Sequence, residues 1–213
     1  MSLIQLSGVP MRVVLVFATF SASIARWCQL ENVKQDTQND YTYIGPWRLD
    51  TCTTLTLDHG KCTEAECPYR IKFGDDEIIE LADAMHGNTV LTALSLGSNK
   101  LSDESAKALA EVLRDNEALT DLHLQGNQIS DDGAVALAQV LQENPVLTTL
   151  NLEHNIIGDE GGQAILDVLQ SNTSALDTVH LSHNDVSPWI LSTIAAENDR
   201  MMKPPEEPHG GEI

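Results

Sequence analysis

Two histidines stand at positions where a pair of imidazoles could hold a metal ion. His123 and His180 occupy the same place in two similar stretches of the chain, with a third such stretch between them. If the three stretches are neighbouring strands about 4.8 Å apart, the two Cβ atoms are separated by roughly 9–10 Å. One zinc ion needs its ligands at about 2 Å. The spacing therefore indicates two polar surface histidines, and we predict no metal site.

Paired carboxylates are the other residues that could do chemistry. Asp131-Asp132 and Asp159-Glu160 are the residue types of a general acid–base pair. Each pair also stands where a helix is predicted to begin, and carboxylates are favoured at the positive end of the helix dipole. The sequence has no Gly-x-Ser-x-Gly, no phosphate-binding glycine loop and no His-Glu-x-x-His motif. We therefore predict that the protein is not an enzyme and uses no cofactor.

The elements that would position these residues repeat along the chain. The pattern Leu-x-x-Leu-x-Leu-x-x-Asn-x-Leu, with Ile or Val at some positions, begins at Leu91, Leu119, Leu147 and Leu176. After the first three patterns, apolar residues recur at i, i+3, i+4 and i+7, the stripe of an amphipathic helix. One unit cannot bury both its strand leucines and its helix stripe, so units must stack. This predicts an α/β solenoid with parallel strands on the concave side and helices on the convex side.

Polar residues mark the ends of the predicted elements. An aspartate that can cap free N–H groups stands just before each helix, namely Asp103, Asp131 and Asp159. An asparagine closes each helix, where a left-handed residue is tolerated, namely Asn116, Asn144 and Asn172. A further asparagine lies at the turn leaving each strand, and its amide can bridge the backbone of adjacent turns. This predicted structural ladder consists of Asn99, Asn127, Asn155 and Asn184.

The repeats resemble the ribonuclease-inhibitor-like leucine-rich repeats found in NOD-like receptors, ribonuclease inhibitor and the Ran GTPase-activating protein. The resemblance covers roughly residues 52–197. It implies a short horseshoe of about five repeats that presents a surface to another protein. The motif is specific for the fold and leaves the partner open.

The first repeat is predicted to be interrupted. Cys52-Thr-Thr-Leu55-Thr-Leu57 reads as a strand with Cys52 in the first leucine position, and the helical part resumes at Phe73. The spacing leaves an 11-residue insert near residues 61–72, and insertions in repeat proteins map to loops. The chain then divides into an irregular segment, a leucine-rich-repeat domain and a disordered tail, over residues 26–51, 52–200 and 201–213.

The N-terminus resembles a secretory signal peptide. An apolar run over residues 13–20 follows Arg12, and the small residues Ser23 and Ala25 lie behind it. This pattern predicts a signal peptide over residues 1–25 and a secreted protein. The run is too short to span a bilayer as a helix, so we predict no membrane insertion of the mature chain. The alternatives are an apolar element that caps the stack and, because repeats of this type are mostly intracellular, a cytoplasmic protein.

The four cysteines are confined to the start of the chain. They are Cys28, Cys52, Cys62 and Cys67. An even number behind a candidate signal peptide favours disulfides, and four cysteines allow three pairings between which the sequence does not choose. Because Cys52 falls in a buried position, the disulfide candidates are Cys28, Cys62 and Cys67. A zinc site is the rival interpretation, and the lack of a clean second Cys pair disfavours it.

The formal net charge of −20 limits the classes of partner. Binding to nucleic acid or to an anionic membrane needs clustered Lys and Arg, so both are disfavoured. A partner protein with a basic surface would be attracted. The simpler interpretation is that the acidic side chains keep the fold soluble.

Residues between the strand leucines should point outward on the concave face. This face is small, polar and mildly acidic, and it lacks the Trp, Tyr and Arg that usually anchor tight binding. An activity like that of ribonuclease inhibitor, which uses aromatic residues heavily, is therefore not expected. The candidate partner-binding residues are Asp58, Ser95, Asp121, His123, Gln125, Asn151, Glu153, His180 and Ser182.

The function predicted from the sequence is a non-enzymatic protein–protein interaction module that binds through its concave face. Two alternatives remain open. One is a regulator of a small GTPase, similar to the Ran GTPase-activating protein, although this chain is short and has no long acidic tail. The other is a fragment of a larger repeat receptor, because five units are few for such an arc.

Mass spectrometry of the native protein tests the predictions made for the start of the chain. We expect an N-terminus at Arg26, at least one disulfide among Cys28, Cys62 and Cys67, and a glycan at the sequon that begins with Asn172. An intact Met1 together with four free thiols would contradict secretion.

Overall fold

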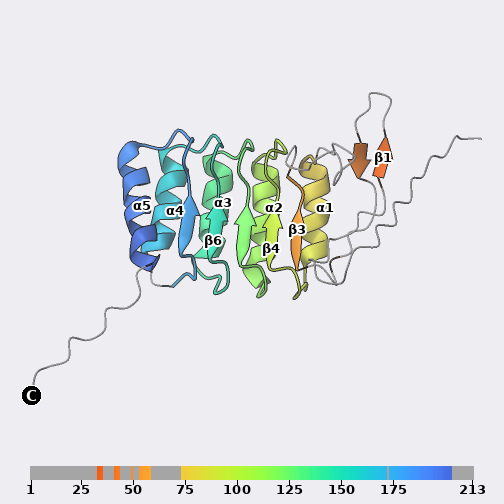
Figure 1. Ribbon diagram of the computed structural model, residues 1–213, viewed down its shortest axis with the longest axis horizontal. Coiled ribbons are helices and arrows are strands. Elements are labelled where there is room, and N and C mark those ends of the chain that lie inside the picture. The colour runs from red at the N-terminus through yellow and green to blue at the C-terminus, as the bar shows by residue number, and fades with distance from the viewer. Residues whose placement is uncertain are drawn as a thin grey trace, which may run out of the picture.

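The structure is a computed structural model that describes residues 33–35, 41–43, 49, 53–58, 73–171 and 173–202. Short strands alternate with helices along the repeat region (Figure 1). The strands are β3 Thr54–Thr56, β4 Ala93–Ser95, β5 Asp121–His123, β6 Thr149–Asn151 and β7 Thr178–His180. The helices are α1 Asp75–Met85, α2 Asp103–Asp115, α3 Asp131–Leu141, α4 Asp159–Gln170 and α5 Pro188–Met202.

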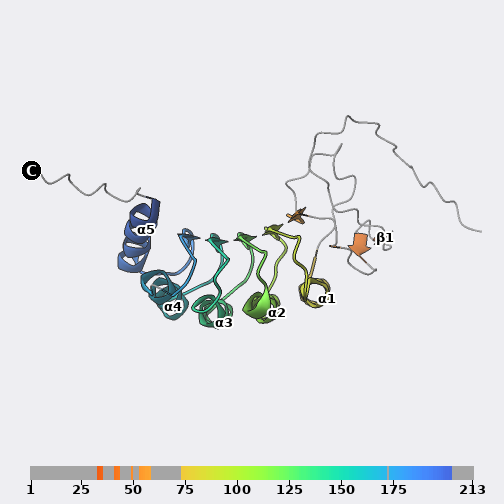
Figure 2. The same cartoon turned by 90° about the horizontal axis from the view of Figure 1, so that it is seen from below.

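Strands and helices form two layers. The sheet runs in the order β3-β4-β5-β6-β7, and each neighbouring pair is parallel. Figure 2 shows the strands in one row and α1 to α4 in a second row on one side of it, whereas α5 stands at the end of the arc beside β7. The predicted α/β leucine-rich-repeat solenoid is confirmed.

The core lies between these layers and is aliphatic. Leu94, Leu122 and Leu150 are paired across β4, β5 and β6 and have no exposed surface. Their neighbours within each strand are only half-buried and face away from the helices. The helix stripes pack against the leucines, as Leu109 and Leu137 do. Burial of this apolar surface is the main stabilising contribution, and it requires a neighbouring repeat on each side.

Asparagine amides join the repeats at the edge of the sheet where the strands end, which we call the exit edge. The Asn127 Oδ1 accepts the N–H groups of Asn99 and Leu101, both at 3.0 Å. Its Nδ2 donates to the carbonyls of Leu96 and Leu124, at 3.0 and 2.9 Å. Each such side chain therefore satisfies backbone groups in its own repeat and in the preceding one. The same arrangement recurs, with small variations, at Asn99, Asn155 and Asn184.

A second row of asparagines joins the repeats at the opposite edge, where the strands begin. Asn116 Oδ1 accepts the N–H groups of Ala118 and Leu119, and its Nδ2 donates to the carbonyl of Asn88. Asn144 makes the equivalent bonds. The prediction of a left-handed residue is wrong for Asn116, whose φ of −83° and ψ of 122° are extended. The extended backbone directs the amide into the stack, where buried groups need it.

The aspartates at the helix starts cap the next helix along the chain. The prediction that each of them caps the helix at whose start it stands is therefore wrong. Asp103 is the first residue of α2, and its carboxylate accepts the Ser130 N–H at 2.7 Å and the Gly133 N–H at 3.1 Å. A Cβ at Gly133 would lie 2.6 Å from that carboxylate, so glycine permits the close approach of α2 and α3. The carboxylates of the other repeats that reach the following helix in this way belong to Asp75, Asp131 and Asp159.

The stack ends on a side chain that replaces the missing strand. Val179 in β7 donates its N–H to Asn198 Oδ1 at 3.1 Å, and Asn198 Nδ2 donates to the Val179 carbonyl at 2.8 Å. Asn198 lies in α5, so this helix covers both the core and part of the open sheet edge. An open edge strand can pair with a strand of another chain, and the contact with Asn198 reduces this tendency.

The first repeat is present, and the segment before it contains regular structure. Leu55, Leu57 and Phe73 are buried in the same core as the later repeats. Within residues 26–51, predicted as irregular, β1 Val33–Gln35 and β2 Tyr41–Tyr43 form an antiparallel pair. Helix α5 extends two residues into the predicted tail.

Several sequence predictions fall outside the described residues. These are the candidate signal peptide, the four cysteines, the insert near residues 61–72, Asn172 and the tail beyond residue 202. Among the helices of the described ranges, none has the length and hydropathy to cross a bilayer.

Replacing Asn127 tests the exit-edge row. Asn127→Ala leaves several buried backbone groups without partners, at about 1–3 kcal/mol each, so we expect a loss of about 3 kcal/mol in the free energy of unfolding. Urea unfolding followed by circular dichroism measures it. The control is Gln128→Ala, since Gln128 is exposed and its substitution should cost less than about 0.5 kcal/mol. Equal losses in the two variants would contradict the role of the amide.

Acid should weaken the aspartate caps. Burial would raise the pKa of Asp75, but hydrogen bonds from the Ser102 and Ser105 hydroxyls and from the backbone outweigh it and hold this pKa below 3.8. A lowered folded-state pKa stabilises the fold above the unfolded pKa, and that contribution is lost as the pH falls below about 4.

We therefore expect Asp75→Ala to cost about 1 kcal/mol at pH 7 and progressively less below about pH 4, as measured by urea unfolding at several pH values. Asp76→Ala is the control, since Asp76 is exposed and next in the chain. A difference from the wild type that does not change with pH would rule out the linkage.

Candidate functional site

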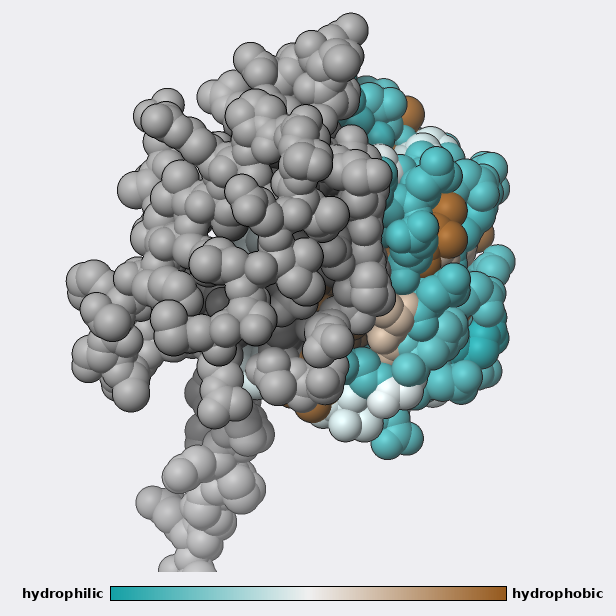
Figure 3. All heavy atoms as spheres, turned by 90° about the vertical axis from the view of Figure 1, so that its right-hand side faces the viewer, coloured by the Kyte–Doolittle hydropathy of each residue, from teal (hydrophilic) through white to brown (hydrophobic). Residues whose placement is uncertain are grey.

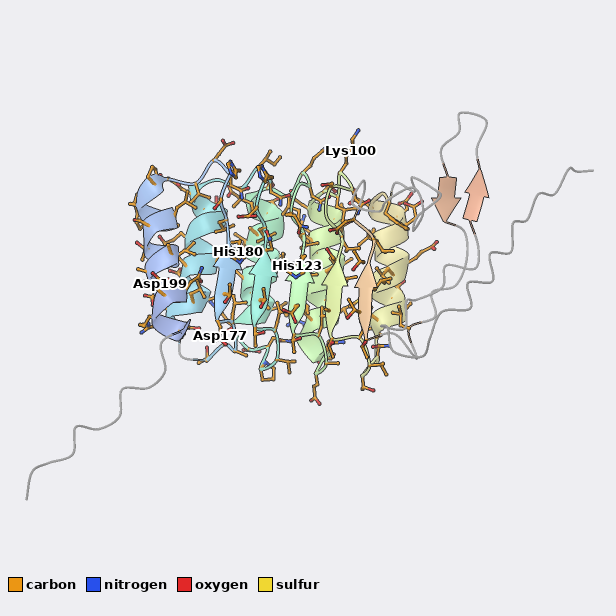
Figure 4. All side chains as sticks on the ribbon, viewed as in Figure 1. Lys100, His123, Asp177, His180 and Asp199 are labelled. Atoms are coloured by element: carbon orange, nitrogen blue, oxygen red, sulfur yellow. The ribbon has the colours of Figure 1, made fainter. Side chains whose placement is uncertain are left out.

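The concave side of the sheet presents an open row of polar side chains. On β5 to β7 the residues directly paired across the strands are His123, Asn151 and His180. Beside them lie Asp121 and, beyond the strands, Glu153, both half-buried. Figure 4 shows His123 and His180 on this face of the sheet. Ser95 is half-buried and Ser182 is exposed.

The two histidines are not brought together. Asn151 lies between His123 and His180, because β6 separates the strands that carry them. This is the arrangement from which the sequence predicts a separation too long for one zinc ion. No group of three or more His, Cys, Asp or Glu side chains with metal-binding geometry occurs in the described ranges.

Asp58 differs from the other predicted face residues because it is buried, with 7% of its surface exposed. Its carboxylate accepts the Ser95 hydroxyl and the Gly97 N–H, and Gln125 Nε2 lies 3.4 Å from it. Gln125 crosses Gly97 to reach it, since a Cβ at Gly97 would lie 2.6 Å from Gln125 Nε2. The Oε1 atom of Gln125 is buried and has no hydrogen-bond partner among the described residues. Asp58 thus organises the face around the first three strands, and the more open polar residues lie on the later strands.

Charge on the described surface is strongly one-sided. In residues 53–58, 73–171 and 173–202 there are 23 acidic and 4 basic side chains. Three of the basic residues form ion pairs within their own helix: Lys107 with Glu104, Arg114 with Glu111 and Arg200 with Glu197. The fourth, Lys100, lies at the exit edge (Figure 4). The strand residues of the concave face, from β3 to β7, therefore include one carboxylate, Asp121, and neither Lys nor Arg.

The exit edge of the last two repeats carries exposed side chains that are not among the partner-binding residues predicted from the sequence. The imidazole rings of His154 and His183 are stacked, with centroids 4.1 Å apart and an interplanar angle of 4°. Ile156 and Trp189 are exposed at 55% and 57%. A comparison with the repeats that begin at Leu91 and Leu119 could have found them, because Ser98 and Gly126 stand at the histidine positions there and charged or amide side chains stand at the other two.

A groove of about 400 Å³ lies on the helix side between α1, α2 and α3. Ala108 and Ala136 line it, and Ile79 stands exposed at one end. Seen from the end of the molecule that carries α1, the described surface is mostly hydrophilic with small hydrophobic spots (Figure 3). Both cations beside the groove, Lys107 and Arg114, are paired with glutamates, so the groove offers no free charge to a ligand.

Comparisons with known proteins identify the repeat type. A family model described as Leucine Rich repeat matches residues 87–110, 115–138 and 143–166. No curated protein sequence matches the chain. The ribonuclease-inhibitor-like subtype remains a prediction.

Two solved structures share the fold. The structure named Leiomodin-1 Actin-Binding Site 2 superposes over 72% of this chain and 82% of its own, with a TM-score of 0.58 and 22% identity. The tropomodulin C-terminal domain of Caenorhabditis elegans superposes over 60% of this chain and 76% of its own, with a TM-score of 0.52 and 17% identity. At these identities the likeness shows the fold alone.

Proposed function

We propose that this leucine-rich-repeat chain is a non-enzymatic protein-interaction module that binds a partner protein through the concave face of its sheet. The observation that carries the proposal is a sheet face that no helix or strand of the described residues covers, with polar side chains from β4 to β7 and no Lys or Arg among its strand residues. The leiomodin-1 structure, whose name describes an actin-binding site, supports the more general part of the proposal. It indicates that a solenoid of this fold can serve as a protein-binding domain.

The partner is proposed to have a basic surface. Asp121 and Glu153 place carboxylates on the face, and the basic residues of the helices are already paired with glutamates. A partner's Lys or Arg would therefore meet acceptors without a competing cation. Such complementarity raises the association rate and fixes the orientation of binding more than it adds affinity.

Charge reversal on the face tests the proposal. Asp121→Lys combined with Glu153→Lys should weaken binding of a purified partner about tenfold or more, since like charges facing each other cost several kcal/mol. The matched control is Glu80→Lys combined with Asp83→Lys, which changes the net charge equally on an exposed part of α1. Both are measured by surface plasmon resonance with the full chain immobilised.

Photo-crosslinking identifies the partner needed for that measurement. A photoreactive residue in place of Asn151 should give a discrete adduct in native extract, whereas one in place of Gln139 on α3 should not. Adducts from Gln139 alone, or an equal loss of binding in both charge variants, would contradict the concave site.

A further inference from the structure

The exit edge of the last two repeats departs at four positions from the two repeats that begin at Leu91 and Leu119. Its two loops lie side by side, because His154 N–H donates to the Ser182 carbonyl and Asp185 N–H donates to the Ile157 carbonyl. Helix α5 begins at this same edge (Figure 1). Trp189 is its second residue and lies in its first turn. We call the four side chains exposed here the exit-edge patch: His154, Ile156, His183 and Trp189.

The fold does not require histidine at two of these positions. His154 and His183 have φ angles of 53° and 60°. These angles lie in the left-handed region, which residues other than glycine adopt at a cost in conformational energy. Gly126 occupies the equivalent position of another repeat with a φ of 71°. Glycine would therefore satisfy the backbone at both sites, so the two histidines are present at a conformational cost.

The other two positions are also polar elsewhere in the solenoid. The residue that follows the asparagine of the exit turn is Ile156 here, whereas it is Lys100, Gln128 and Asp185 in the other repeats. The second residue of the helix is Trp189 in α5, whereas it is Glu104, Asp132 and Glu160 in the preceding helices. Ile156 and Trp189 are also the two most exposed large hydrophobic side chains of the described surface.

The patch continues the concave face. Glu153 and Ser182 are the last outward residues of their repeats, and each is followed directly by a histidine of the patch. The strand residues of the concave face, from β3 to β7, include no Trp, Tyr or Phe, whereas Trp is among the residue types that most often dominate binding energy. Cation–π attraction on the Trp189 ring would add to contacts with Glu160 and Asp185, the exposed carboxylates at the start of α4 and in the turn before α5.

We propose that the exit-edge patch is the apolar anchor of the partner site and takes a protein segment in which large apolar side chains are flanked by Lys or Arg. The inference rests on the proposed function, because the same partner would cover the concave face and this edge. Charge complementarity selects the occupant: in residues 73–171 and 173–202, the last two repeats hold one cation, Arg200, at the far end of α5 and paired with Glu197 at 2.7 Å.

A pair of synthetic peptides tests the anchor on the full chain. Both carry the same lysines, with leucine and phenylalanine between them in one and alanine in the other. We expect the apolar peptide to bind about tenfold more tightly by fluorescence polarisation, which corresponds to about 1.4 kcal/mol. Trp189→Ala combined with Ile156→Ser should abolish this preference. The matched control removes two other exposed apolar side chains, Ile79→Ser and Met201→Ser, and should leave the preference intact.

A second variant distinguishes a contribution of the two imidazole rings to binding from a contribution to the stability of the fold. His154→Gly combined with His183→Gly should reduce the preference and leave the urea unfolding midpoint unchanged or raised, because glycine accepts the backbone angles without cost. Equal binding of the two peptides to the wild type, or an unchanged preference in the Trp189 variant, overturns the anchor.

Two further outcomes distinguish this proposal from related ones. One outcome is that Asp121→Lys with Glu153→Lys weakens binding of both peptides, while the Trp189 variant leaves both affinities unchanged. That result would support the concave site and contradict the proposed anchor. If sedimentation shows that the wild type is a dimer and the Trp189 variant a monomer, a second copy of the chain covers the patch and the stated occupant is wrong.

Discussion

The structure depends on hydrogen bonds that pass from each repeat to the next. A single strand-turn-helix unit leaves buried backbone groups unpaired at both edges of the sheet and at the helix start. The exit-edge amides reach back to the preceding repeat, as Asn127 does to Leu101. The aspartate carboxylates reach forward to the next helix, as Asp103 does to Ser130. Because each repeat completes its neighbours, stability is a property of the stack.

Because a separate set of side chains joins the repeats, the residues of the concave face and the exit edge are free to vary. The asparagines that join the repeats are buried or half-buried and point into the stack, as Asn99 and Asn155 do. Side chains between the strand leucines take no part in those contacts on β6 and β7, where Asn151 and His180 face outward. Equivalent positions of a repeat protein can therefore be compared with one another. A residue that differs from its equivalents without a structural reason indicates a role other than holding the fold.

The two ends of the solenoid differ in what they offer to a partner. Near β3 the carboxylate of Asp58 is buried and engaged with Ser95, Gly97 and Gln125, so that part of the face is internally satisfied. Near β7 the polar side chains are more open, and the exposed Trp189 lies at the adjoining edge. Asn198 pairs with the last strand and reduces the tendency of that strand to add a further one, which favours the concave face and the exit edge as the proposed binding surfaces.

The sequence by itself determined the period, the strand register and the position of the asparagine row. These follow from a repeat of leucines and from the alternation of side chains along a strand, both of which are local in the chain. Only the tertiary structure decided that Asp103 caps the next helix, that Asn116 is extended, that Asp58 is buried and that His154 stacks on His183. Each of these depends on how far one repeat is displaced from its neighbour, so it joins residues about one repeat or more apart and has no signature within a single unit.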